Sequence, residues 1–493
     1  MTKFESLMAY NKDTIAIGKI AERLGWDQAT MMPRGALADR TEEFAALEKI
    51  MHFRKSSNEL NDLLNEVQTD KLDQLQQRQV YLIRRSFDHT RKIPQDLAIA
   101  LARLTPESHA VWEQARHDDD FDAFKPLLAQ VIALRQKEGQ ALAKGTELSS
   151  YDGLLNKYEP DGSTKDIQSM FDSLRGPLVE LRAAVLDKEK PKPLMGIFDI
   201  DQQMVLSQEL ASTFGYDLNR GRIDKAVHPF SSGNSSDVRI TTRTIDKDPM
   251  NCFYSTIHEV GHACYEQNIN SDYAFTAFGK GASLGVHESQ SRIYENQLGR
   301  SRGFTAHLYR RMLKVFGDFG VKDEETFYKL VNRVSDGYIR TEADEIQYNL
   351  HVMLRFDIER SLMSGDLLID DLEAAWNDRF MDDFGYAVDR PSNGILQDVH
   401  WSEGIFGYFP TYSLGNVYSA CLFQALEKDI PNLQDDLAKG DLARATGWLK
   451  KSLQQHGSAY SADQLMTMAC GKSPKVEPLI SYITTKFSDI YNL

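Results

Sequence analysis

Cysteine is scarce in this sequence, and long apolar runs are missing. Four cysteines among 493 residues are too few and too scattered for a disulfide framework, and no Cys-x-x-Cys pair occurs. No run of about 18 apolar residues is present to form a transmembrane helix, and the first twenty residues show none of the basic and apolar segments of a secretory signal peptide. We therefore expect a reduced, cytoplasmic protein with no membrane partner. The cysteines are Cys252, Cys264, Cys421 and Cys470.

Basic residues are also fewer than acidic residues. The 57 Lys and Arg residues face 72 Asp and Glu residues, which gives a net charge of −15. An acidic surface repels nucleic acids and anionic membranes, so we expect neither as a partner. The hydrophobic content of 42% and the charged content of 26% are those of an ordinary globular protein with a large core.

Segments with the alternation of a β-strand are rare. The clearest is SDVRITTRT at residues 236–244, where branched side chains alternate with arginine and threonine. This strand is either an exposed edge that pairs with an extended peptide substrate, with Arg239 as a candidate substrate-binding residue, or a strand of a small sheet that only supports the site. The sequence leaves both alternatives open.

Helical periodicity dominates the remainder of the chain. It runs from Phe4 to Leu24 and is stopped by Pro33. Ser163 with Asp166 forms a capping signature before another helix, and Thr105 is expected to cap a helix whose first residue is Pro106.

The coarse organisation follows from these patterns. Two prolines among charged residues make 187–196 the best linker candidate. We predict an all-α fold with one small β-sheet beside the active site, in a single large domain (1–493) with a deep groove. We expect residues 1–186 to form its helical N-terminal part, which flanks the groove. Residues 197–493 are expected to form its catalytic part, because they contain the zinc-binding motif described next.

One segment of helical character contains a motif with chemical meaning. His258, Glu259 and His262 form His-Glu-x-x-His. Residues four apart share one helix face, so both imidazoles can bind one cation while Glu259 points toward its open side. A catalytic zinc ion has three protein ligands and lowers the pKa of a water molecule in the remaining position. Glu259 can act as the general base for that water, although two packed histidines are an alternative interpretation of the pair.

The third zinc ligand must come from elsewhere in the chain. Glu288, in VHESQSRIYEN, is preferred because it can approach from a second helix. Glu266, four residues after His262, could share the helical face of that histidine but would not close the tetrahedron from another side.

A loop-rich stretch at 389–416 supplies candidates for the oxyanion of acyl transfer. His400, Tyr408 and Tyr412 carry suitable hydrogen-bond donors. The alternative for each of them, which the sequence pattern alone favours, is a packed aromatic or a core residue whose polar atoms are satisfied.

A peptidase that removes C-terminal residues also needs a cation for the substrate carboxylate, and the forked guanidinium of arginine is best suited. Arg340 is the candidate for this substrate-binding role. The alternative is a structural salt bridge to Glu342, to Asp344 or to a distant carboxylate.

Ordered motifs along most of the chain carry a resemblance to a known family. The sequence resembles the thermostable carboxypeptidase Taq family of zinc metallocarboxypeptidases. The matching motifs are WDQATMMP, YDGLLNKYEPDGS, HPF, DVRIT, HEVGH, HES, IRTEAD and GILQDVHW followed by GYFPTY.

The resemblance implies a mostly helical, saddle-like homodimer with a gluzincin-like zinc site in a deep groove. It implies release of single C-terminal amino acids from peptides with broad specificity and poor action before proline, with Zn²⁺ or Co²⁺ as the metal. By resemblance His258, His262 and Glu288 bind the metal and Glu259 is the base.

The resemblance also assigns roles to the remaining candidates. Arg340 would face the C-terminus of the substrate, and His400 with Tyr412 or Tyr408 would steady the oxyanion. Two alternatives remain: an endo-oligopeptidase or dipeptidyl carboxypeptidase with the same zinc chemistry, and a helical scaffold whose zinc is structural and has four protein ligands.

Overall fold

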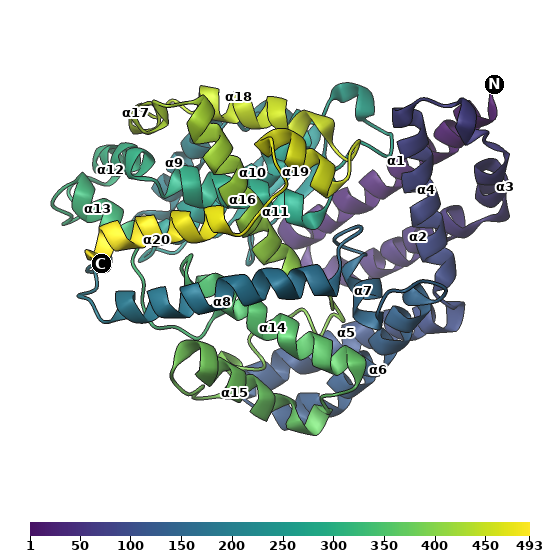
Figure 1. Ribbon diagram of the computed structural model, residues 1–493, viewed down its shortest axis with the longest axis horizontal. Coiled ribbons are helices and arrows are strands. Elements are labelled where there is room, and N and C mark those ends of the chain that lie inside the picture. Colours follow the sequence, from purple (N-terminus) through teal and green to yellow (C-terminus); the bar gives the residue numbers. More distant parts are fainter. The chain divides into compact units, whose positions relative to one another are not determined.

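Two neighbouring helices carry the predicted zinc motif in the computed structural model, which describes residues 1–493 (Figure 1). Helix α10 (Pro249–Asn268) begins where Asp248 accepts a hydrogen bond from the backbone N–H of Asn251, an N-cap that suits a helix with proline in its first turn. Helix α11 (Leu284–Arg292) begins at an equivalent cap made by Ser283. It continues directly into η5 (Ile293–Gly299), which has π-helical hydrogen bonding, a feature often found at functional sites.

A glycine allows these two helices to approach closely. A Cβ atom at Gly261 would lie 2.5 Å from the carbonyl oxygen of Gln290 and 2.6 Å from the Cα atom of Ser291. Carbon atoms pack at about 3.5–4.0 Å, so no larger residue fits without moving α11. The glycine inside the His-Glu-x-x-His motif therefore determines how near α11 comes to the two histidines.

A small sheet packs against α10. Its three strands are β1 (Ile223–Lys225), β2 (Ser231–Asn234) and β3 (Asp237–Thr242). Strand β3 lies in the middle, parallel to β1 and antiparallel to β2. Both of its sides are already hydrogen-bonded, so the hypothesis that residues 236–244 form a free edge for a peptide is wrong. The strand belongs to a small sheet against the helix of the motif.

The chain folds into two compact units that interleave along the sequence. Unit 1 comprises residues 1–90, 191–332 and 418–475. Besides the elements above it contains α1 (Lys3–Thr30), α2 (Leu37–Ser56), α3 (Asn58–Glu66), most of α4 (Gln74–Lys92), α9 (Ile200–Thr213), α12 (Arg302–Phe316), α13 (Glu324–Val331), the second part of α16 (Pro410–Asp429), α17 (Leu433–Lys439), α18 (Ala443–Ser452) and α19 (Ala462–Cys470).

Unit 2 comprises residues 91–190, 333–417 and 476–493. Its regular elements are helices and it has no strand, with α14 packed against α6, α7, α8 and α15, and α20 against α8. Its helices are α5 (Gln95–Asp118), α6 (Phe121–Ala143), α7 (Ser150–Leu155), α8 (Thr164–Leu186), α14 (Gln347–Ser364), α15 (Leu372–Phe384) and α20 (Glu477–Tyr491).

Two helix starts were predicted in the segments that form unit 2, and one of them is confirmed. The predicted cap is confirmed, since Ser163 accepts from the N–H of Asp166 at the start of α8. The predicted helix start at Thr105 and Pro106 is wrong, because both lie inside α5. The Thr105 hydroxyl donates to the carbonyl of Leu101, one turn back. Proline is tolerated there because the helix loses one hydrogen bond but keeps its packing against α6.

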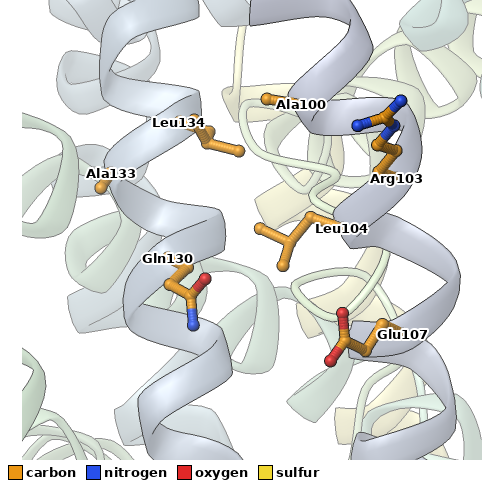
Figure 2. Close-up of a pocket in the computed structure, with 7 residues that line it drawn as sticks. All are labelled: Ala100, Arg103, Leu104, Glu107, Gln130, Ala133 and Leu134. Carbon is orange, nitrogen blue, oxygen red and sulfur yellow. The ribbon is translucent and has the colours of Figure 1, made fainter.

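A surface groove of about 400 Å³ lies between α5 and α6 (Figure 2). Its polar lining consists of Arg103, Glu107 and Gln130, and the remainder is alanine and leucine. The groove contains no histidine, cysteine or nucleophile. It is therefore not the chemical site.

The fold class is confirmed as mainly helical with one small β-sheet. Residues 187–199 between α8 and α9 are non-helical, and the boundary between units falls there, at Lys190 and Pro191. The division into 1–186 and 197–493 within one grooved domain stays a prediction. None of the helices combines the length and apolarity needed to cross a membrane.

Candidate functional site

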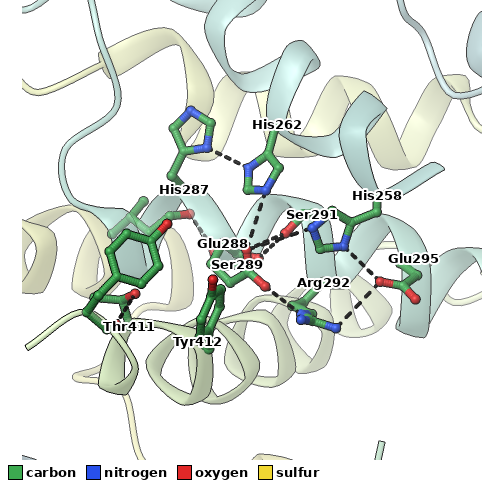
Figure 3. A network of polar contacts seen from close by, with 12 residues as sticks. His258, His262, His287, Glu288, Ser289, Ser291, Arg292, Glu295, Thr411 and Tyr412 are labelled. Carbon is green, nitrogen blue, oxygen red and sulfur yellow. Dashed lines mark hydrogen bonds and ion pairs between the residues drawn. The ribbon is translucent and has the colours of Figure 1, made fainter. Parts of the chain in front are cut away.

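Three side chains from α10 and α11 converge in unit 1 (Figure 3). The ligand atoms of His258, His262 and Glu288 all lie within 4.8 Å of one another. The Nε2 atom of His262 is 3.4 Å, and that of His258 is 3.9 Å, from Oε2 of Glu288. The i, i+4 spacing puts both rings on one face of α10, and the close approach at Gly261 brings Glu288 to them.

The donor set fits a divalent metal ion. Two imidazoles and one carboxylate are ligands that Zn²⁺ accepts, and three protein ligands are typical of catalytic zinc, whereas structural zinc has four. The cluster has three members. Glu266, the alternative third ligand, lies one helical turn beyond His262 and is not part of it.

The ring nitrogens that face away from the cluster are also engaged. Nδ1 of His258 lies 2.8 Å from Oε2 of Glu295 on η5, and Nδ1 of His262 lies 2.6 Å from Nδ1 of His287. Such partners fix which nitrogen of an imidazole carries the proton. In both histidines Nε2 is left to face Glu288.

Arginines surround the two carboxylates of this site. Nε of Arg292 lies 2.6 Å from Oε1 of Glu288, and Arg300 pairs with Glu295 at 3.2 Å. Burial alone would raise the pKa of Glu288, but Arg292 and the two histidines hold that pKa well below its usual range. Burial would likewise raise the pKa of Glu295, but the hydrogen bond to His258 lowers it to about 2. Both groups are therefore ionised at neutral pH and suited to bind or orient cations.

Glu259 lies beside His258 on α10 and is not engaged with these arginines. Its side chain is buried, with 7% exposure. Burial raises the pKa of its carboxyl group to about 7. A carboxyl group with a pKa near neutrality can both accept and return a proton.

A second cluster of charged residues lies within unit 2. Asp398 accepts from two buried arginines: its Oδ1 lies 2.8 Å from Nη2 of Arg340, and its Oδ2 lies 2.5 Å from Nε of Arg355. The salt-bridge alternative for Arg340 is therefore confirmed, and the partner is a distant carboxylate. Two guanidinium groups on one carboxylate leave one positive charge in excess, which favours an additional anion.

The oxyanion candidates lie in the same unit. Nε2 of His400 is 3.1 Å from the hydroxyl of Tyr412, and the ring of Tyr408 packs on that of Tyr412. Burial and the two arginines lower the pKa of His400 to about 3, against the opposing effect of Asp398. The imidazole is therefore neutral at physiological pH and can donate or accept one hydrogen bond at each nitrogen.

A buried glutamate ties down the loop that carries these residues. Glu359 on α14 accepts from Nε1 of Trp401 at 2.9 Å, from the N–H of Gly407 at 2.9 Å and from the hydroxyl of Tyr151 at 2.8 Å. These bonds fix the loop on both sides of its turn. Burial raises the pKa of Glu359 to about 7, and the three hydrogen bonds only partly oppose it.

Arg239, the other predicted substrate-binding residue, has local partners. Its guanidinium donates to both carboxylate oxygens of Asp237, at 2.7 and 3.0 Å, and lies over the ring of Trp26. A role in substrate binding stays a prediction.

Several functional neighbours of the site were not predicted from the sequence. Asp398 precedes His400 by two residues, and Glu295 follows Glu288 by seven, which is two helical turns. That helical spacing was a usable signal for Glu295. His287 directly precedes Glu288, but nothing in the local pattern indicated its contact with His262.

Comparisons with known proteins agree with this geometry. The family model described as carboxypeptidase Taq (M32) metallopeptidase matches residues 6–487. The chain is 35% identical to thermostable carboxypeptidase 1 of Thermus thermophilus, with 99% of each chain covered, and 33% identical to carboxypeptidase 1 of Bacillus subtilis, with 95% of this chain and 94% of the other covered.

Solved structures show the same relationship. The M32 carboxypeptidase of Deinococcus radiodurans superimposes with a TM-score of 0.96 at 34% identity over 100% of both chains. Metallocarboxypeptidase 1 of Trypanosoma cruzi gives 0.95 at 31% identity, covering 100% of this chain and 99% of the other. Sequence and fold agree along almost the entire length, and the chain therefore belongs to the carboxypeptidase Taq (M32) family of metallopeptidases, as a metallocarboxypeptidase that hydrolyses peptides.

Proposed function

We propose that this metallocarboxypeptidase releases single amino acids, with broad specificity, from the C-termini of peptides. The observation that carries the proposal is the three-ligand cluster of His258, His262 and Glu288 with the buried carboxylate of Glu259 beside it. Zn²⁺ is the metal that this donor set fits, and Co²⁺ is expected to substitute for it. Bound there, the cation would polarise the scissile carbonyl and lower the pKa of a water molecule.

Glu259 is the general base in this proposal. Its carboxylate takes a proton from the attacking water and later delivers that proton to the departing amine. The position next to His258 on the helix supports this role, because the buried carboxyl group has His258 and Glu288 among its charged neighbours and no arginine among them. Glu295 and Arg292 orient the ligands and do not exchange protons with the substrate.

Residues of unit 2 are proposed to serve the same reaction. Arg340 would bind the terminal carboxylate of the peptide, supported by the excess positive charge that it and Arg355 leave around Asp398. His400 and Tyr412 would donate hydrogen bonds to the oxyanion, with Tyr408 as the other tyrosine candidate. We also propose that the protein is cytoplasmic, that it forms a homodimer, and that it cleaves poorly before proline. The homodimer and the poor cleavage before proline depend on the family resemblance.

Mass spectrometry of a peptide mixture incubated with metal-loaded protein tests the proposal. Each peptide should give a ladder of successive single-residue losses from its C-terminus. Peptides of the same sequence with an amidated C-terminus should survive, because they lack the carboxylate that Arg340 would bind. Cleavage of the amidated peptides, or losses of two residues at a time, would support an endo-oligopeptidase or a dipeptidyl carboxypeptidase and overturn the proposal.

A further inference from the structure

The two metal-binding histidines are supported in different ways. His258 has the common arrangement, in which the ring nitrogen away from the metal meets a carboxylate, here Glu295 at 2.8 Å. No carboxylate contacts Nδ1 of His262, which instead meets the imidazole of His287 at 2.6 Å (Figure 3). Nε2 of His287 in turn lies 3.0 Å from Oε1 of Glu266. The carboxylate of Glu266 is thus connected to the ligand His262 through the imidazole of His287.

We propose that His287 and Glu266 form a relay of two hydrogen bonds that fixes the tautomer and orientation of His262. The inference rests on the proposed metal centre, since it describes how one ligand of that centre is held.

The proton positions of the relay follow from the role of His262. A metal ligand must present a lone pair on Nε2, so neutral His262 carries its hydrogen on Nδ1 and donates it. Nδ1 of His287 must then be the acceptor, which leaves the hydrogen of His287 on Nε2, where it donates to Glu266. A single assignment satisfies both contacts, and the negative charge of Glu266 favours it.

The relay is built into the same pair of helices as the ligands. Glu266 is 7% exposed and lies on α10, four residues after His262, so the two share a helix face. Its Oε1 also accepts from the N–H of Gly281 at 3.1 Å, and the hydroxyl of Tyr265 accepts from the N–H of Ala282 at 3.2 Å. These two bonds fasten the segment just before α11 to α10.

A glycine in that segment leaves room for the middle of the relay. A Cβ atom at Gly281 would lie 2.8 Å from Cδ2 of His287 and 3.0 Å from the ring of Tyr265. An alanine would therefore push the imidazole of His287 away from its position. Glu266, the alternative third ligand in the sequence analysis, therefore does not bind the metal in this proposal. It holds the ligand His262 in place through His287.

Metal affinity is the measured quantity that tests the relay. Competition with a chromophoric chelator gives the Zn²⁺ affinity, and the visible absorption of the Co²⁺-loaded protein reports the geometry of the ligands. Glu266→Gln and His287→Ala should each weaken Zn²⁺ binding by about tenfold to hundredfold and change the Co²⁺ spectrum. His287→Gln should recover much of the affinity, because its amide can accept at oxygen and donate at nitrogen, as the relay requires.

Glu427→Gln is the matched control, because Glu427 is exposed on α16 and should leave affinity and spectrum unchanged. Urea unfolding of each metal-free variant checks the fold; if Glu266→Gln unfolds, the comparison of His287→Ala with His287→Gln decides. Wild-type affinity and spectrum in both Glu266→Gln and His287→Ala, or equal losses in His287→Ala and His287→Gln, would overturn the relay. If the wild-type protein binds Zn²⁺ but cleaves no peptide, the proposed function fails while these affinities still decide the relay.

Discussion

Replacement of Gly261 by alanine should damage the metal centre although it removes no ligand. The added methyl carbon would lie 2.6 Å from the Cα atom of Ser291, whereas carbon atoms pack at about 3.5–4.0 Å. Helix α11 would have to move by roughly 0.9 Å or more, which is the difference between about 3.5 Å and 2.6 Å. Glu288, three residues before Ser291, would move with it.

The displacement is large compared with what a metal site tolerates. Metal–ligand distances usually vary by about 0.2 Å, so we expect the Zn²⁺ affinity of Gly261→Ala to fall by about tenfold or more. The free energy of unfolding of the metal-free protein should fall only slightly. Overpacking costs about 1–3 kcal/mol, and the higher helix propensity of alanine returns about 1 kcal/mol.

Chelator competition measures the affinity, and urea unfolding of the metal-free protein measures the fold. Gly447→Ala is the matched control, since Gly447 lies inside α18 and a Cβ atom there would meet nothing within 4 Å. That variant should keep its affinity and gain slightly in stability. A Gly261→Ala protein that binds Zn²⁺ within twofold of the wild type would refute the argument that this glycine sets the distance between α10 and α11.

Three further predictions concern single side chains. Glu295→Gln should weaken Zn²⁺ binding by about tenfold to hundredfold, because His258 loses its ionised partner; an unchanged affinity in the chelator assay would contradict this. Arg340→Ala should raise KM for peptides with a free C-terminus by about tenfold to hundredfold, as expected from the loss of a charged hydrogen bond, and an effect confined to kcat would contradict the role. Glu359, whose pKa is raised from 4.5 to about 7, stabilises the fold fully below pH 4.5 and loses that contribution as pH rises through 7. The whole shift corresponds to about 3 kcal/mol, so the fall in the free energy of unfolding between pH 5 and pH 8, measured with urea, should be smaller in Glu359→Gln than in the wild type by about 2–3 kcal/mol. The part of the decline that comes from Glu259, whose pKa is also about 7, should remain, and an equal decline in both proteins would contradict the prediction.

Local spacing predicted the parts of the site that belong to one helix or to neighbouring turns. The four-residue spacing of His258 and His262 puts two imidazoles on one face, and the structure brings Glu288 to them from α11. The cap at Ser163 was equally predictable, because N-capping depends on side chains three residues apart. The helix start at Pro106 was not, because packing of α5 against α6 outweighs the preference of proline for the first turn.

Contacts between distant segments could not be obtained from one sequence. Arg340 and Asp398 are 58 residues apart, and no local pattern distinguishes this partner from the nearer Glu342 and Asp344. The central position of β3 depends on a short parallel strand, β1, that has little sequence signal of its own. His287 was quoted as part of a motif, but its contact with His262 depends on the close approach of α10 and α11.

Zinc content and turnover of Glu259→Gln, measured on the same sample, test the central claim most directly. Glutamine preserves the shape of the side chain but cannot accept the proton of water. The variant should bind one equivalent of Zn²⁺ like the wild type, while its turnover of a free-acid peptide falls by about 10²-fold to 10⁴-fold. A Glu259→Gln protein that binds zinc and still cleaves at the wild-type rate would contradict the role of this carboxylate in the reaction.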